Sequence, residues 1–321
     1  MNPPLVSVIC LGYNQARFLT EALQSVRAQT YSNLELIVVD DASTDHSAVL
    51  IEAFVNRHPA TRFVKIPVNA GQCRAFNRGL ALATGEFVID LAADDVLLPD
   101  RVSRQVAAFE SLGERYGVVY TNARRIDEES GDLGLFYPTA AARARLPTGD
   151  VYRAVLEKFF LCAPTMMIRK RVLDQLGGYD ETLAYEDFDF WVRSSRHFRY
   201  HYLDEVLTAR REVRNSHSRR FYAHKELSTL KVCEKAFRLN RDPAEHRALA
   251  RCVRYHLRQA FLTENFALVD PYAALLAKLA PPDWATRLVV AAARRRVKVA
   301  RYYQRYLRHR YGLEIRLEPG T

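Results

Sequence analysis

The sequence lacks the long hydrophobic runs, paired cysteines and glycine-rich phosphate loops that identify several large protein classes. No run approaches the roughly 18 apolar residues of a membrane span, and the N-terminus does not resemble a signal peptide. The five cysteines are scattered and show no CxxC spacing, so we expect reduced thiols in a cytosolic protein and no zinc site. No GxGxxG or GxxxxGK[ST] follows a predicted strand, which argues against dinucleotide and P-loop sites.

Positive charge is concentrated in the last third of the chain. The 321 residues carry a formal charge of +10. From Arg220 to the end there are 21 basic and 9 acidic side chains, whereas residues 1–219 hold 26 basic and 28 acidic ones. This asymmetry predicts two regions with different partners, one over 1–218 and a basic helical one over 219–321.

Apolar runs alternate with helical periodicity along the first hundred residues. Strands are predicted over residues 5–11, 34–39, 62–66 and 87–91. Helices are predicted over residues 16–29, from a cap at Ser43 or Asp45 to about 55, and over 73–83, with a fourth capped by Asp100. The alternation is typical of an α/β fold with a Rossmann-like, mostly parallel sheet flanked by helices.

Polar residues follow three of these strands at the point where each strand ends. They are Tyr13-Asn14, Asp40-Asp41 and Asp94-Asp95. Ligands of open α/β sheets bind at the carboxyl ends of the strands, so these side chains are expected to converge. Adjacent carboxylates repel each other unless a cation lies between them, and hard oxygen ligands suit Mg²⁺ or Mn²⁺. The alternative interpretation of Asp94-Asp95 is a solvated acidic loop.

Taken together and in this order, these motifs resemble the family 2 inverting glycosyltransferases of the GT-A fold, in their bacterial form. The resemblance covers roughly residues 5 to 215. The segments that carry it are 6–9, 13–14, 39–45, 69–74, 77–79, 83–87 and 94–95.

The resemblance implies roles for individual positions. Tyr13 would lie against the nucleobase, with Asn14 beside it, and Asp41 would accept a hydrogen bond from the base, usually uracil. Asp94 would contact the ribose, and Asp95 would ligate Mn²⁺ or Mg²⁺. Arg74 stands where family members often place a group near the nucleotide, although a solvated helix residue is an equal alternative.

The second half is expected to bind the acceptor. Strands are predicted over 118–122, 160–168 and 200–207, a loop over 127–150, and a helix over 170–176 that ends at Gly177. In the segment 180–193, Glu186, Asp187 and Asp189 precede an apolar helix start, which suits helix capping. The Glu-Asp pair also resembles the family's acceptor motif, so Asp187 is the expected base, and Trp191 is expected in the core rather than as a sugar platform.

The segment after the last strand is rich in arginine. Family members often have a Tyr-Arg-x-His pattern there, whereas this chain has Ala209-Arg210 without the histidine. Arg210, Arg211 and His217 are therefore candidates for phosphate or metal contact, His217 as a metal ligand. A solvated basic loop is the alternative.

The tail is predicted to be helical, with basic residues on one face over 285–311. They are Arg287, Arg294, Lys298, Arg301, Arg305 and Arg308. The interpretations left open are a surface helix packed on the catalytic domain, peripheral contact with an anionic membrane at the inner face, and self-association as a homo-oligomer. No nucleic-acid-binding module is visible.

The predicted function is metal-dependent transfer of a sugar, with inversion, from a nucleotide-diphospho-sugar, a UDP-sugar being favoured. The acceptor would be a hydroxyl of a glycan or lipid-linked molecule in surface polysaccharide or glycoconjugate synthesis. One rival is a protein of the same fold that binds the nucleotide-sugar without catalysis. A nucleotidyltransferase is the other, but it would usually show a glycine-rich, basic loop near the N-terminus.

Overall fold

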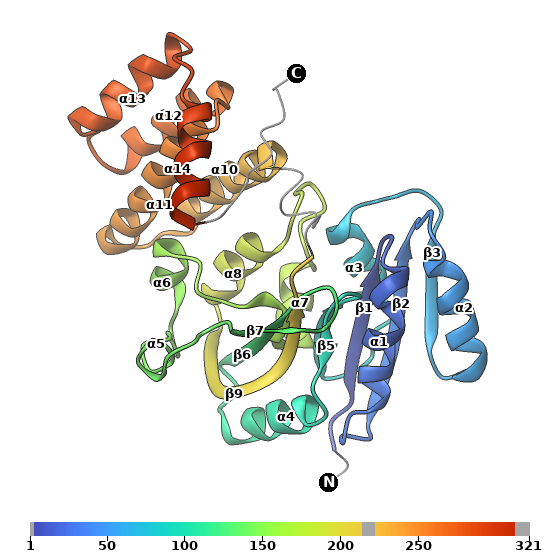
Figure 1. Ribbon diagram of the computed structural model, residues 1–321. Helices are drawn as coiled ribbons and strands as arrows, with labels where there is room; N and C mark the ends of the chain where they lie inside the picture. Colours follow the sequence, from blue (N-terminus) through green and yellow to red (C-terminus); the bar gives the residue numbers. More distant parts are fainter. Residues whose placement is uncertain (1–2, 214–221, 312–321) are drawn as a thin grey trace. The chain divides into compact units, whose positions relative to one another are not determined.

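The computed structural model describes residues 3–213 and 222–311, which form two units (Figure 1). The first unit comprises Met1–Val151, Phe160–Phe190 and Ser194–Val213. The second comprises Tyr152–Phe159, Trp191–Arg193 and Arg214–Thr321. The domain boundary expected between 218 and 219 lies outside the described residues.

The first unit is built on one mixed sheet of the order β3-β2-β1-β4-β8-β6-β9-β5, with β7 paired to β6. The strands are β1 (Val6–Gly12), β2 (Leu34–Asp41), β3 (Arg62–Ile66), β4 (Phe87–Ala92), β5 (Val96–Leu97), β6 (Tyr116–Ile126), β7 (Asp132–Leu135), β8 (Met167–Arg169) and β9 (Arg199–Arg211). The first four are parallel, as are β6 and β9, while β8 runs antiparallel to β4 and β6. The predicted mostly parallel α/β class is confirmed.

Helices cover both faces of this sheet. They are α1 (Ala16–Arg27), α2 (Ser47–Arg57), α3 (Gln72–Leu80), α4 (Arg101–Ser111), α5 (Ala140–Arg143), α7 (Lys170–Leu176) and α8 (Asp187–Ser195), with a 3-10 turn η1 (Ala163–Thr165). Apolar side chains of α1, α2 and α4 share one core with alternate residues of β1 and β4. Helix α3 lies on the opposite face, where a Cβ on Gly79 would come within 2.5 Å of Ile9 Cγ2, so only glycine allows this close approach.

Four local predictions for this unit need correction. The segment 127–150 contains β7 and α5, and only the last two residues of the predicted strand over 160–168 belong to a strand, since η1 precedes it. Asp100 occupies the cap position of α4 without a capping hydrogen bond, because its carboxylate accepts from Thr30 instead. At α2 the cap residue is His46, although Asp45 does accept from the Ser47 N–H.

The second unit is helical, as the sequence of the tail predicted. Its elements are α6 (Tyr152–Glu157), α10 (Tyr222–Leu239), α11 (Pro243–Leu262), η2 (Phe266–Leu268), α12 (Val269–Leu279), α13 (Trp284–Arg294) and α14 (Ala300–Tyr311). Asp242 caps α11 and Asp283 caps α13 through backbone N–H groups of their first turns. No helix within the described ranges is long and apolar enough to span a membrane.

The single basic helix predicted over 285–311 is wrong, because the chain turns between α13 and α14. Arg296 adopts a left-handed φ of 51° just beyond the end of α13. The N–H groups of Arg296 and Val297 donate to the carbonyls of Ala293 and Ala292, which closes the helix end. The six basic residues are therefore divided between two helices and the turn, and they do not form one continuous face.

Candidate active site

The three polar strand ends lie at one edge of the sheet, as predicted. Strand β1 is hydrogen-bonded between β2 and β4, and Gly12 pairs with Asp40 while Leu11 pairs with Ala92. Because all three strands are parallel, Tyr13, Asp41 and Asp94 follow neighbouring strands at their carboxyl ends. This is the edge at which open α/β sheets bind ligands.

Asn14 joins the loops after β1 and β2. Its side-chain oxygen accepts from the backbone N–H of Thr44 at 2.7 Å, and its own N–H donates to the Ser43 hydroxyl at 2.9 Å. The residue has a left-handed φ of 54°, which asparagine tolerates better than most residues. Asn14 therefore positions the two loops, and direct nucleotide contact by its side chain stays a prediction.

Asp41 is held by the loop that leads into α3. Its two carboxylate oxygens accept from the N–H groups of Ala70 at 2.7 Å and Gly71 at 2.9 Å, and Asn69 donates to its backbone carbonyl. Each oxygen keeps a second lone-pair site, because an ionised carboxylate can accept about four hydrogen bonds. The carboxylate is thus fixed in place and still able to accept from a base.

Asp94 and Asp95 form a tight turn between β4 and β5. Burial, with the charge of Asp94 adding to it, raises the pKa of Asp95 to about 8. Burial also raises the pKa of Asp94, although hydrogen bonds and the charges of Arg211 and Arg210 oppose this rise. A buried and a partly buried carboxyl side by side destabilise each other's ionised form, and a divalent cation would relieve this repulsion.

The donor set at this turn fits a magnesium-type ion bound jointly with a diphosphate. Such ions keep several water ligands and use one or two carboxylates plus substrate phosphates. No group of three or more His, Cys, Asp or Glu side chains within residues 3–213 and 222–311 is arranged to hold a metal by itself. Asp94 and Asp95 would therefore provide a site that substrate completes.

Arg211 is a structural clamp on this turn. Its N–H donates to the Asp95 carboxylate at 2.8 Å, and its guanidinium donates to the Asp94 carbonyl, the Asp127 carbonyl, Ser130 and Glu21. Its side chain is only 1% exposed. With its donors used inside the protein, Arg211 fixes the turn and does not suit the predicted phosphate contact.

Arg210 is the better-placed cation of the pair. It packs over the Phe136 ring at 5.5 Å, and its charge acts on both Asp94 and Asp95. The phosphate contact predicted for Arg210 stays a prediction. His217, the predicted metal ligand, lies outside the described residues.

Asp187 opens helix α8 and is partly buried. It shares the first turn of this helix with Asp189, as expected for acids near the positive end of a helix dipole. The preceding residue, Glu186, is anchored by Gln72 of α3, whose amide donates to its carboxylate at 2.8 Å. Trp191 is 4% exposed, in agreement with its predicted place in the core.

The charges of Asp187 and of the acidic turn both act on the buried thiol of Cys162. Burial raises the pKa of Cys162 to about 12, the charge of Arg210 opposes the rise, and the charges of Asp95 and Asp187 add to it. The charges of both carboxylates thus act on this one thiol. That Asp187 and Asp95 serve one site as base and metal ligand stays a prediction.

Asp90 is an acid under the electrostatic influence of Asp187 that the sequence did not single out. It lies in β4 within the apolar run 87–91, and the Tyr179 hydroxyl donates to it at 3.2 Å. The Tyr179 ring stacks on Phe76 of α3 at 4.1 Å. Burial raises the pKa of Asp90 to about 7, the Tyr179 hydrogen bond opposes this rise, and the charge of Asp187 adds to it. The sequence offered one signal for this residue, since Asp90 is the only acid within the otherwise apolar run 87–91.

Replacement of Asp90 by asparagine is expected to weaken the dependence of the unfolding free energy on pH. The pKa of Asp90 in the folded state lies above its ordinary value of 3.8, so folding favours the protonated form and stability falls as pH rises through about 4 to 7. Between about pH 5 and pH 8, wild type should lose about 1–3 kcal/mol more unfolding free energy than Asp90→Asn. Urea unfolding at both values, with chelator present, measures this, and Asp174→Asn is the exposed control. Equal slopes for wild type and Asp90→Asn would contradict the assignment.

Arg74 is exposed on α3 and forms an ion pair with Glu181 at 3.3 Å, with side chains 57% and 46% exposed. Exposed pairs of this kind contribute little to stability. The arrangement neither requires nor excludes a nucleotide contact, so that role stays a prediction.

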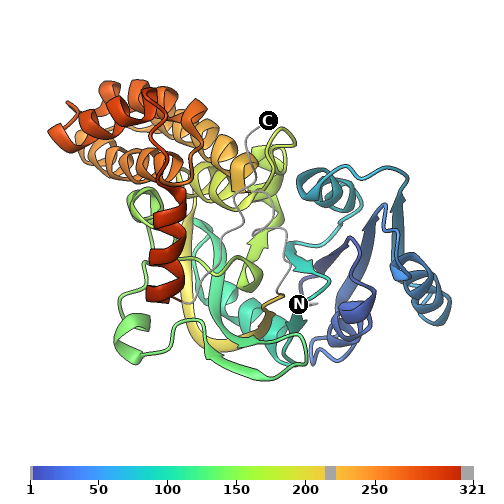
Figure 2. The same cartoon turned by 45° about the horizontal axis from the view of Figure 1, so that its top comes forward.

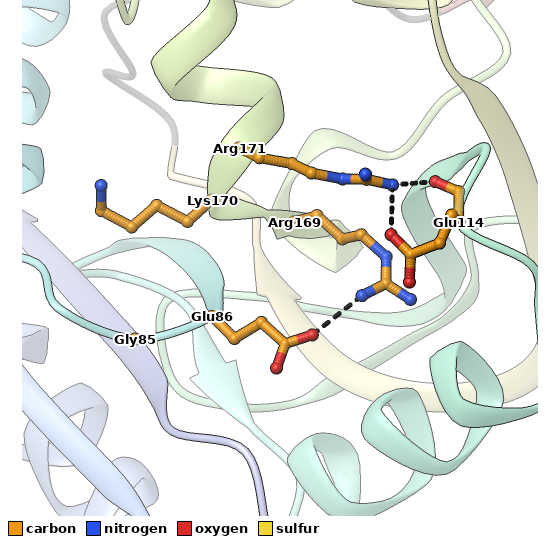
Figure 3. A pocket seen from close by; sticks show the side chains of 6 residues that line it. All are labelled: Gly85, Glu86, Glu114, Arg169, Lys170 and Arg171. Carbon is orange, nitrogen blue, oxygen red and sulfur yellow. Dashed lines mark hydrogen bonds and ion pairs between the residues drawn. The ribbon is translucent and has the colours of Figure 1, made fainter.

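A separate hollow of about 300 Å³ lies at the opposite end of β4. Its lining residues are Gly85, Glu86, Glu114, Arg169, Lys170 and Arg171 (Figure 3). Arg169 pairs with Glu86 and Arg171 with Glu114, both at 2.9 Å, while Lys170 points away from them and pairs with Asp174 (Figure 3). Each cation is neutralised within the protein, and the hollow is remote from the carboxyl edge, so it is not the active-site candidate.

Comparison with known proteins agrees with this architecture. Residues 7–177 match the family model described as Glycosyl transferase family 2. An uncharacterised glycosyltransferase of Nostoc sp. is 36% identical over 175 residues, which are 50% of this chain and 54% of that protein. The matches to the first four curated relatives span 36% to 63% of their lengths.

Solved structures show the same fold. S. aureus TarS in complex with UDP superposes with a TM-score of 0.69 at 17% identity, covering 99% of this chain and 94% of that one. The mannosyltransferase PcManGT of Pyrobaculum calidifontis, in complex with GDP-Man and Mn²⁺, gives a TM-score of 0.58 at 22% identity and covers 94% and 84%. The family match spans more than half of the sequence. The chain therefore belongs to glycosyl transferase family 2 and has the GT-A fold.

Proposed function

We propose that this protein transfers a sugar, with inversion, from a nucleotide-diphospho-sugar to a hydroxyl group of a glycan or lipid-linked acceptor. A UDP-sugar is the favoured donor, and synthesis of a surface polysaccharide or glycoconjugate is the favoured setting. The observation that carries this proposal is the convergence of three polar strand ends at one edge of the sheet, where Arg211 holds the Asp94-Asp95 turn. Family membership supports transferase chemistry, and five free cysteines suit a reducing, cytoplasmic location.

The proposed reaction is a single displacement at the anomeric carbon. Asp187 takes the proton of the acceptor hydroxyl as its oxygen attacks, and the nucleoside diphosphate leaves from the opposite face, so the configuration inverts. Its position at the start of α8, anchored through Glu186 and Gln72, holds the carboxylate relative to α3 and the sheet. No covalent intermediate is formed, and no nucleophile from the protein is needed.

Asp94 and Asp95 are the residues that would hold Mn²⁺ or Mg²⁺ in this proposal. When bound, such an ion offsets the negative charge on the leaving diphosphate. Arg211 keeps the acidic turn in one geometry, and Arg210 adds a positive charge beside it. Tyr13 and Asp41, at the neighbouring strand ends, would contact the base, with Asp41 oriented by the N–H groups of Ala70 and Gly71.

Calorimetric titration of UDP, GDP and dTDP, each with Mn²⁺ and with chelator, tests the proposal. UDP is expected to bind in the presence of Mn²⁺ and at least about tenfold more weakly with chelator, because the acidic turn repels a diphosphate without the cation. If none of the three nucleotides bound under either condition, the proposal would be wrong. Tight nucleotide binding without release of sugar from any donor would instead support the non-catalytic alternative.

A further inference from the structure

Helix α13 of the helical unit presents an apolar stripe to solvent. The stripe consists of the exposed residues Trp284, Leu288 and Ala291, at spacings of four and three residues. The exposed Arg295 follows four residues later on the same face. Trp284 is 75% and Leu288 61% exposed. The opposite face, with Thr286 and Ala293, is buried in the helical unit, whose margin α13 forms in both views (Figures 1 and 2). A surface helix usually shows polar side chains to water, so this arrangement is unusual.

Positive charge predominates along the stripe, and the two aspartates beside it, Asp283 and Asp270, are paired with Arg254 and Arg294. Residues 284–311 contain nine lysine and arginine side chains and no aspartate or glutamate. Arg295, Arg296 and Lys298 are exposed and have no ion pair with any of residues 3–213 or 222–311. On α14, Tyr302 and Tyr306 are 71% and 54% exposed and lie one turn apart. The surface thus combines exposed aromatic side chains with unneutralised positive charge.

We propose that the α13 surface docks on an anionic lipid bilayer, lying in the plane of the headgroups. Tryptophan and tyrosine favour the boundary between headgroups and acyl chains, and exposed arginines are attracted by anionic lipids. Trp284 and Leu288 would enter the boundary, and Arg295, Arg296 and Lys298 would lie among the headgroup phosphates. A duplex nucleic acid would use the arginines alone, since its phosphate backbone offers no apolar phase for the Trp-Leu stripe.

The two tryptophans make the proposal directly measurable. Trp191 is 4% exposed and Trp284 75%, and the chain has no other tryptophan. Addition of vesicles rich in phosphatidylglycerol to the full-length protein should therefore shift the emission to shorter wavelength through Trp284. Co-sedimentation should accompany the shift, and vesicles of pure phosphatidylcholine or high salt should weaken both.

A double variant, Trp284→Ser with Leu288→Ser, is expected to weaken vesicle binding at least about tenfold in co-sedimentation. The matched control is Val49→Ser with Val68→Ser, which removes side chains of 62% and 75% exposure from the catalytic unit and should leave binding unchanged. Wild type that neither shifts nor sediments with anionic vesicles overturns the proposal, as does a double variant that binds like wild type. A concentration-dependent dimer lost in the double variant, without vesicle binding, would assign the surface to a second copy instead.

Discussion

The Asp187→Asn variant is expected to release UDP from a UDP-sugar about 10³-fold more slowly than wild type, with water as acceptor, and to bind UDP with unchanged affinity. The rate falls because an amide cannot accept the proton of the attacking hydroxyl, and general-base assistance contributes about 10²- to 10⁴-fold. Affinity is retained because Asp187 belongs to α8, whereas the nucleotide candidates lie at the ends of β1, β2 and β4. Asparagine also suits a helix N-terminus, so the fold should persist.

The matched control for this experiment is Asp174→Asn. Asp174 is an exposed acid of α7 that pairs with Lys170, on the side of the neutral hollow. Its replacement should change the rate of UDP release by less than about twofold, since surface substitutions of this kind have small effects. A full rate in Asp187→Asn would exclude it as the base. Asp90, the other carboxylate whose charge interacts with it, would then be the next variant to measure.

The Asp95→Asn variant is expected to bind UDP roughly 100-fold more weakly in the presence of Mn²⁺, a loss of about 2.8 kcal/mol. The reason is that the amide carries no charge for the cation, while its oxygen can still accept from the Arg211 N–H and preserve the turn. With chelator present, the variant should bind UDP no more weakly than wild type, since it lacks one of the two carboxylates that repel the diphosphate. The measurement is the same calorimetric titration, with circular dichroism to establish that the variant is folded.

Asp100→Asn is the control for the acidic turn. Asp100 lies five residues further on, is exposed, and bonds to Thr30 rather than facing the strand ends. It should bind UDP as wild type does, with and without Mn²⁺. Metal-dependent binding that survives in Asp95→Asn would move the cation away from this residue and leave Asp94 as the carboxylate to examine.

Much of the catalytic unit follows from local patterns. Strand β3 and helix α7 have the predicted bounds, and the apolar face of α1 is buried as its spacing indicated. Gly177 ends α7 in a left-handed conformation of φ 71°, which is the reason a glycine there predicts a helix end. The strand ends converge because parallel strands place their carboxyl termini at one edge, so alternation alone predicted the location of the site.

Other features depend on contacts between distant parts of the chain. Asp95 and Arg211 are 116 residues apart, and nothing near either of them distinguishes the buried Arg211 from its neighbour Arg210. The short β8 is likewise decided by its antiparallel pairing with β4 and β6, and not by its apolar composition. The single helix predicted over 285–311 was wrong. The spacing of its arginines is compatible with one long helix, whereas the chain turns at Arg296.

By itself, the sequence determined the fold class and the edge of the sheet that holds the candidate site with its Asp94-Asp95 turn. These follow from periodicity and from residues adjacent in the chain, whereas the role of Asp187 came from the family resemblance and stays a prediction. Only the tertiary structure decided that Arg211 holds the acidic turn, that Asn14 and Asp41 are anchored by neighbouring loops, and that Asp90 is bonded to Tyr179. Those roles depend on burial and on partners far away in the chain. Burial raises the free energy of a charged group and limits it to the hydrogen-bond donors that the protein supplies.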